Sequence, residues 1–354
     1  MSTIPGKDDA ERLSWLGRHR LWLVADLLLE RGLVSPQLAK LAGQLAAPQV
    51  LAMKRQTDEE RRVLNALVAA DIDVLVLKGA LLAQTVYPRP ESRFRSDMDL
   101  FTEPGQVPKV EEALAVLGYA EPWEIQSPKE LRQRLWERRV GKQSFLIDLH
   151  WDLRNHPALQ QRFSFDEVMA QSEPLPGLGE GARGMGRAHA LLNASMHYFN
   201  DYADQRPAQG LLDKDLLWRA MSADEQAQSI DLACQRGLAG LLAESLARSR
   251  DFFGTPVTEQ QIDELRAAGR DQWATGMVRA NEQRHSAYWF ALRSEPGLRR
   301  KLGRVRSGLF PPVQYMRQMY PEGSRLGVVG LYLRRIWGLM GVKGFRVRGS
   351  GFRG

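Results

Sequence analysis

Apolar residues recur at helical spacing along the first 70 residues of the chain. In ERLSWLGRHRLWLVADLLLERGLV, leucine and valine return every three to five positions, as they do on one face of an α-helix. Ser35 and Pro36 suit the start of a further helix, because serine caps helix ends and proline fits the first turn. We therefore expect residues 1–70 to form a helical N-terminal segment.

The pattern changes to short apolar or alternating runs after residue 70. Such runs, bounded by glycine, proline or charged residues, are typical of strands. They fall at VLVL (74–77), within 96–102 and at QSFLIDLHWDL (143–153). Because helical stretches lie between them, we expect residues 71–175 to form an α+β unit, in which helices flank a small mixed sheet.

Helical spacing returns from residue 188 onward, for example in DEQAQSIDLACQRGLAGLLAESLARS. The glycine-rich segment LPGLGEGARGMG at 175–186 precedes it, and we interpret this segment as a linker. It is not a P-loop, because no Gly-Lys-Ser/Thr closes it. We expect a helical domain at 187–298 and a separate C-terminal tail at 299–354.

Charge is distributed unevenly over the 354 residues, whose net charge is +7. From Arg299 to the end, 13 lysines and arginines accompany a single acidic residue, Glu322, whereas the first 298 residues carry 36 basic and 41 acidic side chains. Such a tail indicates an anionic partner: nucleic acid, anionic lipid or an acidic protein. A solvated surface explains it as well. Its glycines disfavour a firm helix, so packing against the helical domain is the simplest interpretation.

The sequence also excludes several classes of protein. The single cysteine, Cys234, permits no intrachain disulfide and no multi-cysteine metal cluster. No apolar signal core begins the chain, and no run reaches the ~18 residues of a membrane span. We therefore expect a cytoplasmic protein without a membrane span.

Candidate metal-binding and catalytic residues lie on the predicted strands. Because side chains alternate between the faces of a strand, Asp97 and Asp99 share one face, and Asp148 and His150 share a face of the later strand. If these strands pair, three carboxylates converge, and a cation is expected to offset their charge. Oxygen ligands favour Mg²⁺ or Mn²⁺ over zinc. Histidine at 150 could orient Asp148, contact a substrate or pack beside Trp151.

Two divalent ions about 3.5–4 Å apart would activate an attacking hydroxyl and stabilise a leaving pyrophosphate. Asp97, Asp99 and Asp148 are thus the candidate metal ligands and catalytic residues, and Asp148 could also help to deprotonate an acceptor hydroxyl.

Lysine, glycine and arginine near the first strand predict a site for the triphosphate. Gly79 would let a phosphate approach backbone N–H groups where a helix begins. Lys78 and Arg95, with Arg93, could neutralise phosphate charge. Lys78 is equally well explained as a strand-end lysine, and one of the two arginines could simply solvate its loop.

The segments VLVLKGALLAQTVYPRPESRFRSDMDLFT and FLIDLHWDL resemble the uncharacterised bacterial nucleotidyltransferase family of the polymerase-beta-like superfamily. Matching motifs are Leu77-Lys78-Gly79, Asp97-Met98-Asp99-Leu100 and Asp148-Leu149-His150-Trp151. A weaker similarity covers His197, LLDKDLLWR and LFPPVQYMRQMYP. The resemblance implies a small mixed sheet flanked by helices, Mg²⁺ dependence, and transfer of a nucleoside monophosphate from an NTP to an acceptor, which could be a small molecule, a protein or RNA.

One departure from the superfamily pattern leaves two hypotheses. Gly79 is followed by Ala80, where most members have a serine hydroxyl. The first hypothesis is a Mg²⁺-dependent nucleotidyltransferase that binds an NTP between the α/β unit and the helical domain. The second is a catalytically weak or inactive protein of the same fold, which acts on nucleic acid, an anionic membrane or a protein through its basic tail.

Two polar features of the helical domain have plain structural interpretations. His197 has apolar neighbours, so we interpret it as a core histidine. Asp213, Lys214 and Asp215 could extend into a cleft, and a solvated helix face or an N-cap pattern explains them as well.

Overall fold

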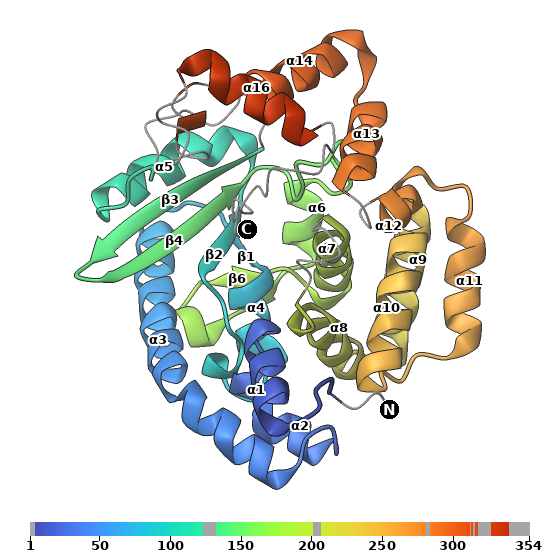
Figure 1. The fold of residues 1–354 in the computed structure, drawn as a ribbon. Coiled ribbons are helices and arrows are strands. Elements are labelled where there is room, and N and C mark those ends of the chain that lie inside the picture. The colour runs from blue at the N-terminus through green and yellow to red at the C-terminus, as the bar shows by residue number, and fades with distance from the viewer. Residues whose placement is uncertain are drawn as a thin grey trace.

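The computed structural model describes residues 4–122, 132–200, 207–280, 284–311, 313, 316–317 and 327–339. In this part of the chain, helices surround one six-stranded mixed sheet (Figure 1). The fold is therefore α+β, as the sequence predicts.

The N-terminal segment contains three helices: α1 (Asp9–Arg18), α2 (Ala25–Glu30) and the long α3 (Pro36–Ala69). A left-handed residue, Arg20 (φ 61°), interrupts the apolar pattern between α1 and α2. The Ser35 hydroxyl accepts a hydrogen bond from the Leu38 N–H, 3.2 Å away, and so caps α3 as expected. Helix α3 packs along one side of the α/β unit (Figure 1).

The sheet has the strand order β3-β4-β2-β1-β6-β5. Its centre comprises β1 (Leu75–Leu77), β2 (Asp97–Phe101) and β4 (Gln143–His150), the strands that the sequence predicts. Strand β2 pairs antiparallel with β1 and parallel with β4. The apolar side chains of β1 are completely buried, as expected of a strand covered on both faces.

The sequence pattern does not indicate the outer strands of the sheet. Strand β3 (Gln133–Val140) forms a hairpin with β4, and Gly141 takes the left-handed conformation (φ 59°) between them. On the opposite edge, β6 (Arg183–Gly184) pairs with β1 and with β5 (Glu173–Pro174). A Cβ at Gly184 would lie 2.5 Å from a Leu81 methyl carbon. The interpretation of 175–186 as a linker is thus incomplete, because its glycines also permit close packing in the sheet.

Helices α4 (Lys78–Thr85), α5 (Val107–Val116) and α6 (Phe165–Ala170) accompany the sheet. The following helices are α7 (Arg187–Asn200), α8 (Gln209–Ala220), α9 (Ala223–Gln235), α10 (Ala239–Phe253), α11 (Glu259–Gly269) and α12 (Gly276–Ala280). Helix α10 packs against α7, α8, α9 and α11, and α7 also contacts α4. One continuous cluster of buried hydrophobic residues, from Ile4 to Met277, joins these helices to the α/β unit.

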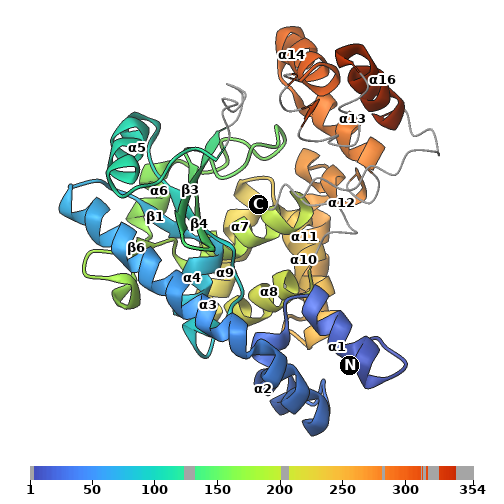
Figure 2. The same cartoon turned by 60° about the vertical axis from the view of Figure 1, so that its left-hand side comes forward.

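The C-terminal region contains α13 (Arg284–Ser294), α14 (Gly297–Leu309) and α16 (Val328–Leu339). These helices lie together at one end of the molecule (Figure 2). Helix α16 forms although it contains Gly330 and Gly338, so the expectation of a tail without a firm helix is wrong for this segment. Residues 340–354, and most of the LFPPVQYMRQMYP motif, lie outside the described residues. Within the described chain, no helix is both long and apolar enough to span a bilayer.

Candidate functional site

The two strands that carry the predicted aspartates are direct neighbours in the sheet. In the parallel β2–β4 pair, Asp99 is in register with Asp148, and Asp97 is in register with Leu146. Residues in register on adjacent strands point to the same face. Asp99 and Asp148 therefore come together at the middle of this strand pair, as the sequence predicts.

His150 completes a compact buried group with these two carboxylates. Its Nε2 lies 3.0 Å from Oδ1 of Asp99 and 3.2 Å from Oδ2 of Asp148. One candidate ligand atom from each of the three residues lies within 4.8 Å of the other two. Asp97 is on the same face of β2, but it does not belong to this compact group.

Two polar atoms of the group have no hydrogen-bond partner in the described structure. They are Oδ1 of Asp148 and Nδ1 of His150, and both are buried. Buried polar atoms are almost always paired, and exceptions often mark an ion or a water. The oxygen-rich donor set and the unpaired Asp148 oxygen fit a divalent cation held between β2 and β4.

Lys78 supplies part of the positive charge that the aspartates require. It follows β1 in the left-handed conformation (φ 45°), which is costly for a residue with a side chain. Its Nζ donates a hydrogen bond to Oδ1 of Asp99 over 2.5 Å. The Asp99 side chain is buried, and that of Lys78 is 10% exposed. The backbone conformation and the ion pair together place this ammonium group beside the carboxylates.

Asp97 and Asp99 have pKa values shifted in opposite directions. Burial alone would raise the pKa of Asp99, but Lys78 and His150 outweigh burial and hold that pKa far below its usual range. Burial, and then the negative charge of Asp99, raises the pKa of Asp97. Burial lowers the pKa of His150, but the nearby Asp148 carboxylate outweighs it, so the net shift is upward.

Gly79 permits a close contact between the start of α4 and the arginine-bearing loop. A Cβ at this position would lie 3.0 Å from Nη1 of Arg93 and 3.1 Å from Cβ of Arg95. The next residue, Ala80, is fully buried in the main hydrophobic core. A serine hydroxyl at that position would face apolar packing, so Ala80 is weaker evidence against catalysis than the sequence implies.

The structure places Arg95 at the centre of a buried hydrogen-bond network. Its Nε and Nη2 bond to the Glu60 carboxylate at 2.7 and 2.9 Å, and Nη2 also bonds to the Thr57 hydroxyl at 2.6 Å. Its Nη1 donates to the carbonyl oxygens of Pro90 and Arg93. The three hydrogen bonds to Glu60 and Thr57 anchor the loop to α3, and the other two lie within the loop. Direct contact between Arg95 and a triphosphate would require some of them to break.

Arg93 joins the same loop to the helical domain. Its guanidinium forms a bidentate pair with Asp213 of α8, at 2.9 and 2.7 Å. The Tyr87 hydroxyl also donates to Asp213, over 2.7 Å. Burial opposes the charge of Arg93, but Asp213 outweighs burial and raises the arginine pKa. Sequence reasoning did not identify this buried link.

The LLDKDLLWR helix has buried charges rather than a solvated face. Asp213, Lys214 and Asp215 are all at most 5% exposed. Asp215 accepts hydrogen bonds from Arg31, Arg219 and Thr255. The interpretation as a solvated face is therefore wrong, and the charged residues of α8 hold other elements in place.

His197 of α7 lies close enough to the site for the charges of Lys78 and Asp99 to act on it. Burial, and then the positive charges of Lys78 and Arg154, lowers the pKa of His197 well below its ordinary value, while Asp99 opposes the shift. This environment favours a neutral imidazole. It is not the apolar surrounding that the sequence interpretation assumed. The sequence does contain one indication of this polar environment, because Asn193 lies one helical turn before His197. Asn193 accepts hydrogen bonds from Arg154 near the same site.

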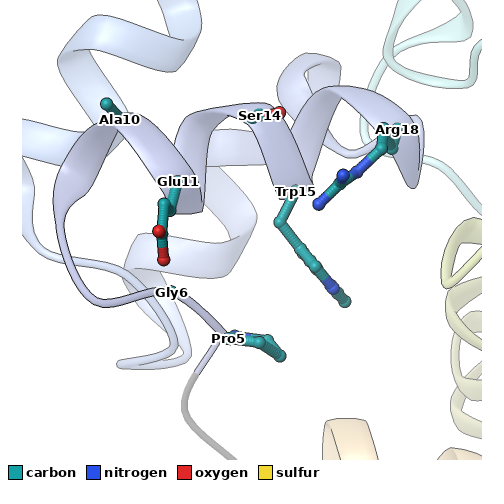
Figure 3. Close-up of a pocket in the computed structure, with 7 residues that line it drawn as sticks. All are labelled: Pro5, Gly6, Ala10, Glu11, Ser14, Trp15 and Arg18. Carbon is teal, nitrogen blue, oxygen red and sulfur yellow. The ribbon is translucent and has the colours of Figure 1, made fainter.

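Two hollows on the surface lie elsewhere. A pocket of about 490 Å³ lies beside α1, among Pro5, Glu11, Trp15 and Arg18 (Figure 3). A second hollow, of about 910 Å³, lies between α3 and the β3–β4 hairpin and is lined by Arg62, Arg138 and Lys142 among others. Neither lining includes Asp99, Asp148 or His150.

Adjacent strands of a small mixed sheet that present acidic side chains are the arrangement expected of a nucleotidyltransferase fold. The chain belongs to a family described as uncharacterised nucleotidyltransferases, whose sequence profile matches residues 7–254. This match confirms the resemblance and covers the sheet and helices α1 to α10. No curated protein matches the chain.

Proposed function

We propose that this protein is a Mg²⁺- or Mn²⁺-dependent nucleotidyltransferase that moves a nucleoside monophosphate from an NTP to an acceptor hydroxyl. The observation that carries the proposal is the in-register placement of Asp99 and Asp148 on adjacent parallel strands. The buried, unpaired Oδ1 of Asp148 adds to it, because it leaves a coordination position for a cation. Membership of a nucleotidyltransferase family supports this reaction class.

Asp97, Asp99 and Asp148 are the proposed metal ligands. When bound, the divalent ions would neutralise triphosphate charge and lower the pKa of the acceptor hydroxyl, as in two-metal transferases. The carboxylate of Asp148, with His150 beside its Oδ2, is the proposed base for the hydroxyl proton. His150 restricts the orientation of both carboxylates, so that they need little rearrangement.

Lys78 and the start of α4 are the proposed triphosphate site. The first N–H groups of an α-helix have no partners within the helix, and Lys78 begins α4 directly beside Asp99. A phosphate near Gly79 would therefore meet backbone donors and an ammonium group. Arg95 would contribute by holding its loop against α3, given that its guanidinium donors are already engaged.

The helical domain is the proposed second wall of the site. Helix α7 contacts α4, the charges of Lys78 and Asp99 act on its His197, and the Arg93–Asp213 pair fixes α8 to the arginine-bearing loop. A nucleotide bound at Lys78 would thus lie between the sheet and α7. The acceptor remains open to three classes: small molecule, protein side chain or RNA end.

One observation favours the second hypothesis, a protein of this fold that binds without catalysis. Lys78 and His150 already satisfy the carboxylate of Asp99 in the described structure. Because the site already contains a counter-ion, it requires a metal cation less strongly than a site of three unpaired carboxylates would. The two hypotheses differ in whether the Asp99–Lys78 pair opens when a nucleotide and a metal bind.

Calorimetric titration with an NTP, with and without Mg²⁺, tests the proposal. We expect Mg²⁺-dependent binding by the wild type and loss of that dependence in Asp97→Ala/Asp99→Ala. The control is Asp58→Ala, which removes an exposed carboxylate of α3. Equal binding by the wild type and the double variant would rule out the metal site. Transfer of label from an NTP to components of a cell extract then separates an enzyme from a non-catalytic binder.

A further inference from the structure

Helix α14 combines exposed leucines with a dense set of cations. Leu298 and Leu302, one helical turn apart, are 72% and 59% exposed. The helix contains no acidic residue, and its cations are Arg299, Arg300, Lys301, Arg304 and Arg306. Leaving leucine side chains exposed to water on such a surface costs free energy. An uncovered apolar pair beside so many cations is the pattern of an interfacial helix.

Helix α16, beside α14, also exposes aliphatic side chains. Val329 and Leu333, also four residues apart, are 73% and 54% exposed. Leu331, by contrast, is buried against Met316. The Arg335 side chain donates to the Gly308 carbonyl over 2.6 Å and ties α16 to α14. The helix is therefore held in place by one face, while a second apolar face has no cover in the described structure.

Both helices lie apart from the proposed catalytic site. They occupy one end of the molecule with α13 (Figures 1 and 2), and they follow the region that the family profile matches.

We propose that α14 and α16 form a docking surface for an anionic lipid bilayer. The cations fit the negative charge of the lipid headgroups, and the four exposed aliphatic side chains fit the region just below them. RNA would use the cations together with stacked aromatic rings, and would leave these aliphatic groups in water. The protein would thus bind at a membrane surface, with its nucleotidyltransferase core held beside the bilayer.

Vesicle co-sedimentation of the full chain tests this surface. We expect the wild type to sediment with vesicles of phosphatidylglycerol mixed with phosphatidylcholine, and to bind far less to phosphatidylcholine alone. Leu298→Ser/Leu302→Ser should weaken binding by about tenfold, and Val329→Ser/Leu333→Ser should also weaken it. Arg299→Glu/Arg300→Glu should remove the preference for anionic lipid. Circular dichroism verifies that each variant is folded.

A matched control is available on α3. Leu41 and Leu45 are also four residues apart and are 41% and 45% exposed, so Leu41→Ser/Leu45→Ser should bind vesicles like the wild type. The proposal is overturned if the wild type ignores anionic vesicles, or if either serine pair in α14 or α16 leaves binding unchanged. Tight binding of single-stranded RNA that depends on Arg299 and Arg300, but not on the leucines, would identify a nucleic-acid surface instead.

Discussion

Asp99 and Asp148 stand directly opposite each other on the parallel strands β2 and β4. This relationship is fixed by the register of the sheet, since a slip of one residue would turn one carboxylate to the opposite face. Met98, Leu100 and Ile147 alternate with the aspartates along the strands, and their side chains are buried on the opposite face of the sheet. Their burial holds that register. The geometry of the site is thus a consequence of core packing.

Replacing Asp148 should weaken metal binding in the absence of nucleotide. In Asp148→Asn, the proposed site loses a charged ligand while the shape of the side chain is kept, so the affinity for Mn²⁺ should fall by about tenfold or more. Calorimetry with Mn²⁺ alone measures the change. Asp58→Asn on exposed α3 should bind like the wild type. Unchanged Mn²⁺ affinity in Asp148→Asn would contradict the assignment of this residue.

Replacing Lys78 should make stability depend on divalent metal. In Lys78→Met, the stem of the side chain is kept but Asp99 loses its buried counter-ion, which should cost about 2–4 kcal/mol of unfolding free energy in the presence of EDTA. A bound cation would restore charge balance, so Mg²⁺ should raise the unfolding temperature of the variant more than that of the wild type. Thermal unfolding with EDTA and with Mg²⁺ measures both. An equal Mg²⁺ effect on the two proteins would speak against a cation site beside Asp99.

Removing the charge of Asp213 should destabilise the contact between the arginine-bearing loop and α8. In Asp213→Asn, the buried guanidinium of Arg93 loses its bidentate partner, so the unfolding free energy should fall by about 3 kcal/mol. Urea denaturation measures this. The exposed pair Arg61–Asp58 provides the comparison, because Asp58→Asn should cost less than about 1 kcal/mol. Arg93→Met/Asp213→Asn should lose less than the sum of the single variants; additive losses would show that the pair is not coupled.

His156 should make the fold less stable in mild acid. Burial, and then the nearby charge of Arg304, lowers the pKa of His156 to about 4, whereas an unfolded histidine titrates near ~6.5. The unfolded state therefore binds the extra proton first. The stabilising contribution is complete above about pH 6.5 and declines as the pH falls toward 4, by about 2 kcal/mol.

His156→Phe isolates this effect from other titrating groups. The substitution keeps a ring beside Phe290, on which His156 stacks, and removes the titration. Urea unfolding at pH 7 and pH 5 should show a smaller loss of stability in the variant than in the wild type. Equal losses would mean that His156 is not the responsible histidine.

Local sequence patterns predict the central strands and the aspartate pair well. The runs at β1, β2 and β4 are short and apolar, and their alternation places Asp99 and Asp148 without knowledge of distant contacts. Strand β3 is different, because four of its eight residues are charged. Two of its three arginines, Arg134 and Arg138, pair with Glu111 on α5 and Glu59 on α3, and these partners lie far away in the sequence.

The surroundings of the site were less predictable for the same reason. Arg95 bonds to Glu60, 35 residues earlier, and Arg93 bonds to Asp213, 120 residues later. Without these partners, both arginines look like solvent-exposed cations near a phosphate site. The position of Lys78 beside Asp99 likewise depends on an unusual backbone conformation. This conformation favours glycine, so a lysine in the sequence does not predict it.

The pairing of β6 with β1 has a consequence for synthesis of the chain. Strand β1 can pair with β2 early, but its other edge stays open until Gly184 has emerged, about 100 residues after Val76. At the usual speed of translation this delay lasts on the order of ten seconds. The unpaired N–H and C=O groups of an open strand edge can bond to strands of other chains. A nascent chain that stalls before residue 184 would therefore expose this edge, and folding of the nucleotidyltransferase core should need protection from aggregation during that interval.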